Sequence, residues 1–230
     1  MKIRNLLILL TIILALLFMV VIMPELSLSG LGNQLQNKIP DNSVQNIPSP
    51  VESIPAGQLT VPDLILLGAR EEAKKGTLYD ASYQVIDYPG GDVAHDRGAC
   101  TDVVIRAFRN AGIDIQQLIH EDMLADFPSY PHNWGLNATD PNIDHRRVPN
   151  QVTFMSRHGK TLSLDPTQHP EDWNWGDVVY WKFPNGDEHC GIVSDRLNKR
   201  GLPLVIHNAG ICQEEDALLR WEITGHYRYP

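Results

Sequence analysis

The sequence predicts an α+β domain in which N-terminal helices pack on a C-terminal antiparallel sheet. Apolar residues recur at helical spacing in the first half of the globular region. Segments rich in β-branched and aromatic residues, separated by polar turns, occupy the last third. The chain has 230 residues, of which 43% are hydrophobic and 20% are charged. This composition is typical of a globular protein, and the length fits one domain with additional segments.

The net charge and the cysteine content exclude several classes of protein. With 19 Lys and Arg against 28 Asp and Glu, the formal net charge is −9. The chain therefore has no excess of cations for a phosphate backbone, and we predict no nucleic-acid partner. Three cysteines are too few for a disulfide-built scaffold. No compact metal-ligand motif such as CxxC or HExxH is present, so we predict no metal and no other cofactor.

Residues 1–23 are expected to form a signal anchor or a cleaved signal peptide. Lys2 and Arg4 precede an apolar run over residues 6–23, a pattern typical of export signals and membrane anchors. The run can span a bilayer, which slightly favours the anchor, although residues 27–29 offer a small-x-small cleavage site. Either alternative places the rest of the chain outside the cytoplasm, tethered in the cell envelope (periplasm) or secreted.

Residues 24–61 are rich in Pro, Ser, Asn and Gln and are expected to form a flexible linker, so the globular domain is expected over 62–230. Helical spacing with start and stop signals predicts three helices in this domain, over residues 63–76, 100–111 and 151–159. Four segments predict strands: "WGDVVYWKF", "HCGIVSD", "PLVIHN" and "WEITGHYRY". The stretch 114–164 otherwise shows no regular pattern.

Three residues form a candidate catalytic constellation: Cys100, His189 and His207. Cys100 lies at the start of a predicted helix, where the macrodipole and the free N–H groups favour a thiolate. A thiolate is a nucleophile near neutral pH, and a histidine titrates in the range needed to shuttle its proton. A second polar residue is needed to fix the tautomer of that histidine.

The strand pattern predicts how the two histidines meet. If His189 pairs with His207, a loop over 194–202 joins their strands, and both imidazoles share the face toward the helix of Cys100. A slip of one residue would present Asn208 instead, so the third position stays open between His207 and Asn208.

The other two cysteines have different expected roles. Cys190 follows His189 directly and points to the opposite face of the strand, so we expect it in the core rather than as the nucleophile. A disulfide between Cys190 and Cys212 is conceivable in an oxidising compartment, and the sequence leaves this question open.

The blocks "YPGGDVAHDRGACTDVVIRAF", "WGDVVYW", "HCGIVSD" and "LVIHN" resemble those of NlpC-type cysteine peptidases, which are papain-like enzymes of the cell wall. The resemblance implies that Cys100 is the nucleophile, His189 the base and His207 its orienting partner. Tyr88, twelve residues before the cysteine, matches the tyrosine that helps to stabilise the tetrahedral intermediate. With "HEDM", "NIDHRRVPN" and "ITGHYRY", the stretch 64–229 also closely resembles a bacterial domain-of-unknown-function family placed in that superfamily.

Two departures from the peptidase pattern bear on the substrate. "ACTD" stands where these peptidases have "DCSG", and the insert 114–164 has no clear counterpart in the simpler enzymes. The insert carries Arg146 and Arg147, which can hold a substrate carboxylate in a cleft. The slightly favoured alternative is surface charge or an ion pair with Asp144, Glu121 or Asp122.

We therefore expect a cell-envelope cysteine hydrolase that cleaves amide bonds, with peptidoglycan peptides as its partner substrate and the membrane as a partner of its N-terminal segment. The backbone N–H of Cys100 and the hydroxyl of Tyr88 are expected to receive the oxyanion. Two alternatives remain. One is an acyltransferase that uses the same Cys–His site, and the other is an inactive, tethered cell-wall binding module.

Overall fold

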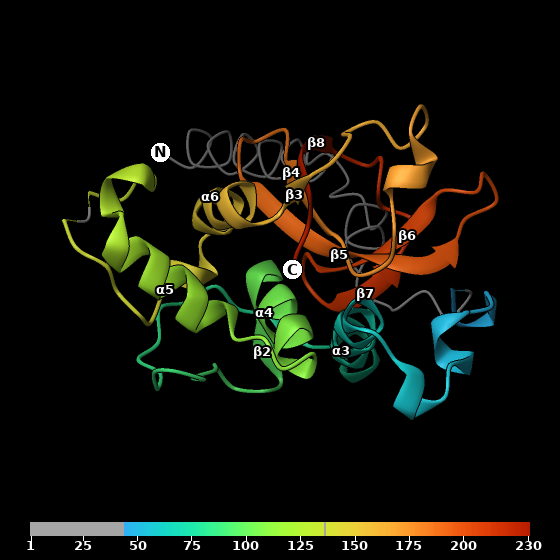
Figure 1. The fold of residues 1–230 in the computed structure, drawn as a ribbon, viewed down its shortest axis with the longest axis horizontal. Helices are drawn as coiled ribbons and strands as arrows, with labels where there is room; N and C mark the ends of the chain where they lie inside the picture. The colour runs from blue at the N-terminus through green and yellow to red at the C-terminus, as the bar shows by residue number, and fades with distance from the viewer. Residues whose placement is uncertain (1–43, 136) are drawn as a thin grey trace, which may run out of the picture. The chain divides into compact units, whose positions relative to one another are not determined.

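The computed structural model describes residues 44–135 and 137–230, so the expected signal segment 1–23 and the first part of the expected linker lie outside the described residues. The described part is an α+β domain, as predicted, and it has four α-helices and a six-stranded antiparallel sheet (Figure 1). Among these residues no helix combines the length and the apolar character needed to cross a membrane.

The helices begin and end where local signals place them. They are α3 (Val61–Lys75), α4 (Cys100–Asn110), α5 (Ile115–Ala125) and α6 (Val148–His158). At the start of α3 the Asp63 carboxylate accepts hydrogen bonds from the backbone and hydroxyl of Thr60, and Gly76 ends the helix at φ 64°. The sequence pattern did not predict α5, which Asp114 caps by accepting a hydrogen bond from Gln116 N.

The main sheet has the strand order β3-β8-β4-β5-β6-β7. Its strands are β3 (Lys160–Thr161), β4 (Val178–Lys182), β5 (Glu188–Leu197), β6 (Pro203–Asn208), β7 (Cys212–Glu215) and β8 (Glu222–Arg228). Four of them are the predicted strands. The polar sequence of β7 carries no β-branched residue, which is why the pattern missed it. A separate parallel pair, β1 (Leu78–Tyr79) and β2 (Arg97–Gly98), lies just before α4.

The two faces of the sheet have different coverings. Tyr180, Cys190 and Ile192 belong to one hydrophobic core together with residues of α3 and α4. Trp181 and Val193 point to the other face, into a second cluster that residues 217–223 cover. Figure 1 shows α3 and α4 side by side next to the sheet, with the start of α4 near the central strands.

The observed pairing of β5 with β6 corrects the expected register. His207 lies opposite Gly191 rather than His189, so the pairing is displaced by two residues. Strand β5 also continues to Leu197, with an irregularity after Val193, where a loop over 194–202 was expected. Because the displacement is even, His189 and His207 still share one face of the sheet, as the predicted pairing required.

The expected flexible linker does not extend to residue 61. Residues 44–58 form three short 3₁₀ turns, η1 (Val44–Asn46), η2 (Val51–Ser53) and η3 (Ala56–Gln58). Val51 is 1% exposed and belongs to the main core. The Asp195 carboxylate accepts hydrogen bonds from Ser49 Oγ at 2.6 Å and from Val51 N at 2.9 Å. These tertiary contacts order a segment whose composition alone predicts a linker.

Candidate active site

Cys100 is the first residue of α4, as predicted, and an ion pair between Asp102 and Arg146 stabilises this helix start. The Asp102 carboxylate caps the helix by accepting from Ala99 N at 2.6 Å. Arg146 donates to the same carboxylate from Nε and from Nη2, each at 2.9 Å. Arg146 is thus engaged in an internal ion pair, as the favoured alternative expected, but its partner is Asp102 rather than Asp144, Glu121 or Asp122.

The two histidines are in direct contact. His189 Nε2 lies 2.9 Å from His207 Nδ1, and the two side chains are 2% and 0% exposed. His207, rather than Asn208, is thus the residue that contacts the His189 ring. Asn208 instead donates from Nδ2 to the carbonyls of Thr77 and Gly98, both at 3.0 Å, and so ties the segment before Cys100 to the sheet.

The imidazole pair lies on the opposite face of the sheet from the one we expected. Both rings pack around Trp181, at centroid distances of 5.7 Å for His189 and 5.9 Å for His207, rather than facing α4. Gly191 makes the diagonal contact between them possible. A Cβ at this position would lie 2.9 Å from the His207 Cβ and 2.7 Å from the Ile206 carbonyl oxygen, so a side chain there would displace the ring.

Cys100 meets the beginning of β5 rather than the face of the sheet, and Cys190 is therefore part of its environment. The pKa of the Cys100 thiol lies well below its ordinary value, chiefly because the Cys190 thiol donates a hydrogen bond to it. Hydrogen bonds from the His189 ring and from the Cys190 backbone act in the same direction, against the effect of burial. Burial raises the pKa of Cys190, which keeps that thiol protonated and able to donate.

None of the three cysteines forms a disulfide, so the conceivable link between Cys190 and Cys212 is absent in these described residues. Cys190 points away from the His189 face, as predicted, and joins the core. The prediction missed its second role as a hydrogen-bond donor to Cys100. Strand alternation gives the direction of a side chain but not the position of a helix that packs beside it.

A carboxylate that the sequence analysis did not identify completes the chain of polar contacts. Glu215, on the unpredicted strand β7, places Oε1 2.9 Å from His207 Nε2. Arg220 holds the other oxygen, with Nη2 at 2.5 Å from Glu215 Oε2. Contacts with His207 and Arg220 lower the pKa of Glu215 to about 2, although burial opposes the shift. Glu215 is therefore an anion at neutral pH.

The Glu215 anion determines which nitrogens carry protons. Glu215 Oε1 lies at ion-pair distance from His207 Nε2 without hydrogen-bond alignment, and its charge favours the neutral His207 tautomer that carries hydrogen on Nε2, with Nδ1 as an acceptor. His189 then donates from Nε2 to His207 Nδ1. The ring of His189 also contacts Cys100, so a proton can pass between the sulfur and this imidazole, as a general base requires.

The structure does not bring Tyr88 to this site. Its ring packs edge-on against His120, at a centroid distance of 4.9 Å, and it does not line the cleft beside Cys100. Tyr79 lines the cleft instead, from the short strand β1. Burial and the nearby thiol of Cys100 raise the pKa of Tyr79 to about 12, so its hydroxyl remains a donor. A twelve-residue spacing in the sequence cannot show how the loop between Tyr88 and Cys100 folds.

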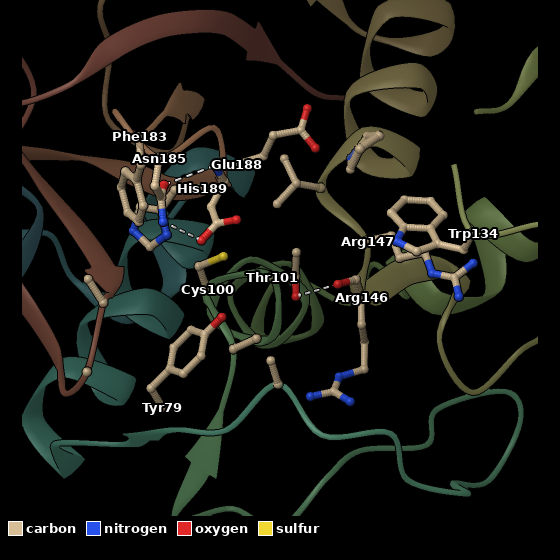
Figure 2. Close-up of a pocket in the computed structure, with 17 residues that line it drawn as sticks. Tyr79, Cys100, Thr101, Trp134, Arg146, Arg147, Phe183, Asn185, Glu188 and His189 are labelled. Carbon is tan, nitrogen blue, oxygen red and sulfur yellow. Dashed lines mark hydrogen bonds between the residues drawn. The ribbon is translucent and has the colours of Figure 1, made fainter. Parts of the chain in front are cut away.

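Cys100 and His189 open onto a cleft of about 620 Å³, a size typical of small-molecule and peptide sites. Figure 2 shows the cleft with Tyr79 below Cys100, His189 on one side, and Trp134 with Arg147 on the far side. Within residues 44–135 and 137–230, no three His, Cys, Asp or Glu side chains are grouped so that they could hold a metal ion. The arrangement is suited to nucleophilic catalysis by a thiolate.

Comparison with known proteins identifies the family to which the chain belongs. Residues 66–229 match the model of a domain of unknown function, DUF1287. The chain is 50% identical over 163 residues to the uncharacterized protein YijF of Escherichia coli (strain K12), a match that covers 70% of this chain and 78% of that protein. No solved structure matches the chain. The chain belongs to the DUF1287 family.

Proposed function

We propose that this protein is a cysteine hydrolase of the cell envelope that cleaves amide bonds in peptidoglycan peptides, on a papain-like fold of the NlpC type. One observation carries the proposal. The thiol of Cys100 lies at a helix start, its pKa is well below the ordinary value, and it accepts a hydrogen bond from the ring of a buried histidine. Perturbed nucleophiles of this kind are typical of catalytic sites. The choice of substrate rests on the resemblance of the sequence blocks to cell-wall peptidases.

In the proposed reaction, Cys100 Sγ attacks the amide carbonyl carbon while His189 Nδ1 holds the thiol proton. The tetrahedral intermediate collapses when the C–N bond breaks, and His189 gives its proton to the departing amine. A water molecule then attacks the thioester carbonyl, His189 takes one of its protons, and the C–S bond breaks. The proton returns to Cys100, and a carboxylic acid leaves.

The same geometry offers donors for the oxyanion. Cys100 is the first residue of α4, and the first N–H groups of a helix have no acceptor within it. We assign the second donor to the Tyr79 hydroxyl, which lines the cleft beside Cys100, in place of Tyr88. Each donor of this kind typically contributes about 10²- to 10³-fold to kcat.

The experiment that tests the proposal is incubation of the full-length chain with muramidase-digested peptidoglycan, followed by mass analysis of the products. We expect fragments that differ from the starting muropeptides by the addition of one water across an amide bond. Added glycinamide serves as an acyl acceptor and reveals transfer as a second product mass. Intact muropeptides after prolonged incubation would contradict the proposal and favour the inactive binding module.

Glu215→Gln tests the role of Glu215 in positioning the imidazole pair. We expect kcat to fall about 10- to 100-fold with little change in KM, because an amide no longer fixes the tautomers of His207 and His189. The acidic limb of the pH–activity profile, where protonation of the imidazole pair reduces activity, should move to lower pH. The reason is that the protonated pair is no longer stabilised by its nearest anion.

Two variants serve as controls for this prediction. Glu215→Asp keeps the negative charge and should partly restore the position of the pH limb. Glu222→Gln removes an exposed carboxylate from strand β8 of the same sheet and should leave the profile unchanged. If Glu215→Gln lowers only the melting temperature, and the pH profile of the remaining activity does not move, Glu215 has a merely structural role.

A further inference from the structure

The wall of the cleft opposite His189 carries a cation that has no hydrogen-bond or ion-pair partner among the described residues. Arg147 lines the cleft, and its Cζ lies 4.2 Å from the centroid of the Trp134 ring. Among residues 44–135 and 137–230, no hydrogen bond or ion pair engages the Arg147 guanidinium. Partial burial lowers its pKa, and the negative charges of Asp144 and Asp140 nearby offset this shift only in part.

The neighbouring arginine shows that the lack of a partner is specific to this position. The Arg146 guanidinium pairs with the Asp102 carboxylate and donates hydrogen bonds to the carbonyls of Asp80 and Ser82. In the part of the chain that the structure describes, Arg147 has no such acceptor. The Arg147 guanidinium lies over the Trp134 ring, and this cation–π contact leaves its N–H groups free to donate hydrogen bonds.

The opposite side of the cleft carries charges of the other sign. Asp187 and Glu188 line the cleft next to His189, and neither forms an ion pair within the described residues. Burial raises the pKa of Glu188. In Figure 2 Arg147 and Trp134 lie across the cleft from Asn185 and His189, with Cys100 and Thr101 between them. The cleft is thus polarised, positive on the Arg147 side and negative near the base.

We propose that Arg147, whose guanidinium lies over the Trp134 ring, binds a carboxylate of the peptide whose amide bond Cys100 attacks. This inference rests on the proposed function and specifies its substrate class, a peptide with a free carboxylate. A guanidinium group matches a carboxylate with two parallel hydrogen bonds, and a carboxylate on the Arg147 side of the cleft would neutralise this charge. The carboxylate belongs to the end of the peptide or to one of its side chains.

The test uses synthetic muropeptides in three forms: free acid, amidated only at the terminal carboxyl, and amidated only at a side-chain carboxyl. We expect the full-length chain to lose about 10- to 100-fold in kcat/KM for one of the two amides, which identifies the bound group. Arg147→Gln should lower kcat/KM for the free acid by a similar factor and cleave all three forms about equally. Arg147→Lys should restore part of the preference.

Arg200→Gln is the control, because Arg200, although more exposed than Arg147, likewise has no side-chain partner among the described residues and lines a different hollow. It should keep the wild-type preference. If the wild-type chain cleaves the three forms equally and Arg147→Gln matches it, the inference is wrong while the proposed function stands.

A binding measurement separates the two proposals if no form is cleaved. In that event the proposed hydrolase activity fails, and calorimetry with the Cys100→Ala chain still compares the three peptides with and without Arg147→Gln. If the free acid binds more tightly than the amidated peptides, and Arg147→Gln removes that difference, the result supports the carboxylate site. Equal binding of all three forms, or no binding, overturns it.

Discussion

Cys100→Ala is expected to lose amide hydrolysis by about 10⁴-fold or more while it keeps the wild-type fold. The substitution removes the atom that forms the thioester, and the remaining donors and histidines act only through that intermediate. The side chain is 4% exposed and lies at the edge of the core, so the loss of one sulfur has a small effect on packing. Rates of muropeptide cleavage and a circular dichroism spectrum measure the two parts of this prediction.

Cys212→Ala is the matched control, since it removes a buried cysteine of the same core that does not line the cleft. We expect it to retain activity. A thiol-reactive probe at mildly acidic pH should label Cys100 and spare Cys190 and Cys212, because burial raises the pKa of the latter two thiols. Undiminished cleavage by Cys100→Ala would refute the assignment of the nucleophile.

Arg70→Met is expected to lower the free energy of unfolding by about 3–5 kcal/mol, the usual cost of breaking a buried ionic cluster. Arg70 is 2% exposed and contacts two buried carboxylates, with Nη2 at 2.6 Å from Asp195 Oδ1 and at 3.0 Å from Glu214 Oε1. Methionine fills much of the volume but leaves the two anions with one cation, Arg196. Urea unfolding followed by tryptophan fluorescence measures the loss.

The loss should also depend on pH. Burial alone would raise the pKa of Asp195, but hydrogen bonds from Ser49 and Arg70 outweigh it and lower the pKa. A depressed folded-state pKa stabilises the protein above the unfolded value of about 4 and ceases to do so as the carboxyl is protonated. The difference between wild type and Arg70→Met should therefore shrink below about pH 4.

Lys74→Met provides the comparison for Arg70→Met. Lys74 lies on the same helix and pairs with Glu71, but both side chains are more than half exposed. Such surface pairs contribute less than about 1 kcal/mol. An equal, small effect of the two substitutions would mean that the Arg70 cluster does not hold residues 44–61 to the domain in the way that its contacts indicate.

The parts of the fold that depend on local pattern could be predicted from the sequence. The capped start and glycine end of α3 and the apolar spacing of α4 are local signals, and so is the alternation in β4, β5, β6 and β8. Strand β7 and helix α5 were missed, since neither carries a strong periodic pattern of its own. Residues 44–61 look like a linker until their contacts with Asp195 are known.

The sequence by itself determined the α+β class, the position of Cys100 at a helix start and the shared face of His189 and His207. These follow from the 3.6 and 2.0 periods of helices and strands, which depend on neighbouring residues alone. Only the tertiary structure decided which face the imidazoles occupy, that Glu215 contacts His207, and that Tyr79 rather than Tyr88 reaches the cleft. Those features depend on strand order, on a register displaced by two residues and on the path of loops. Contacts between residues far apart in the chain determine these, and no local pattern records them.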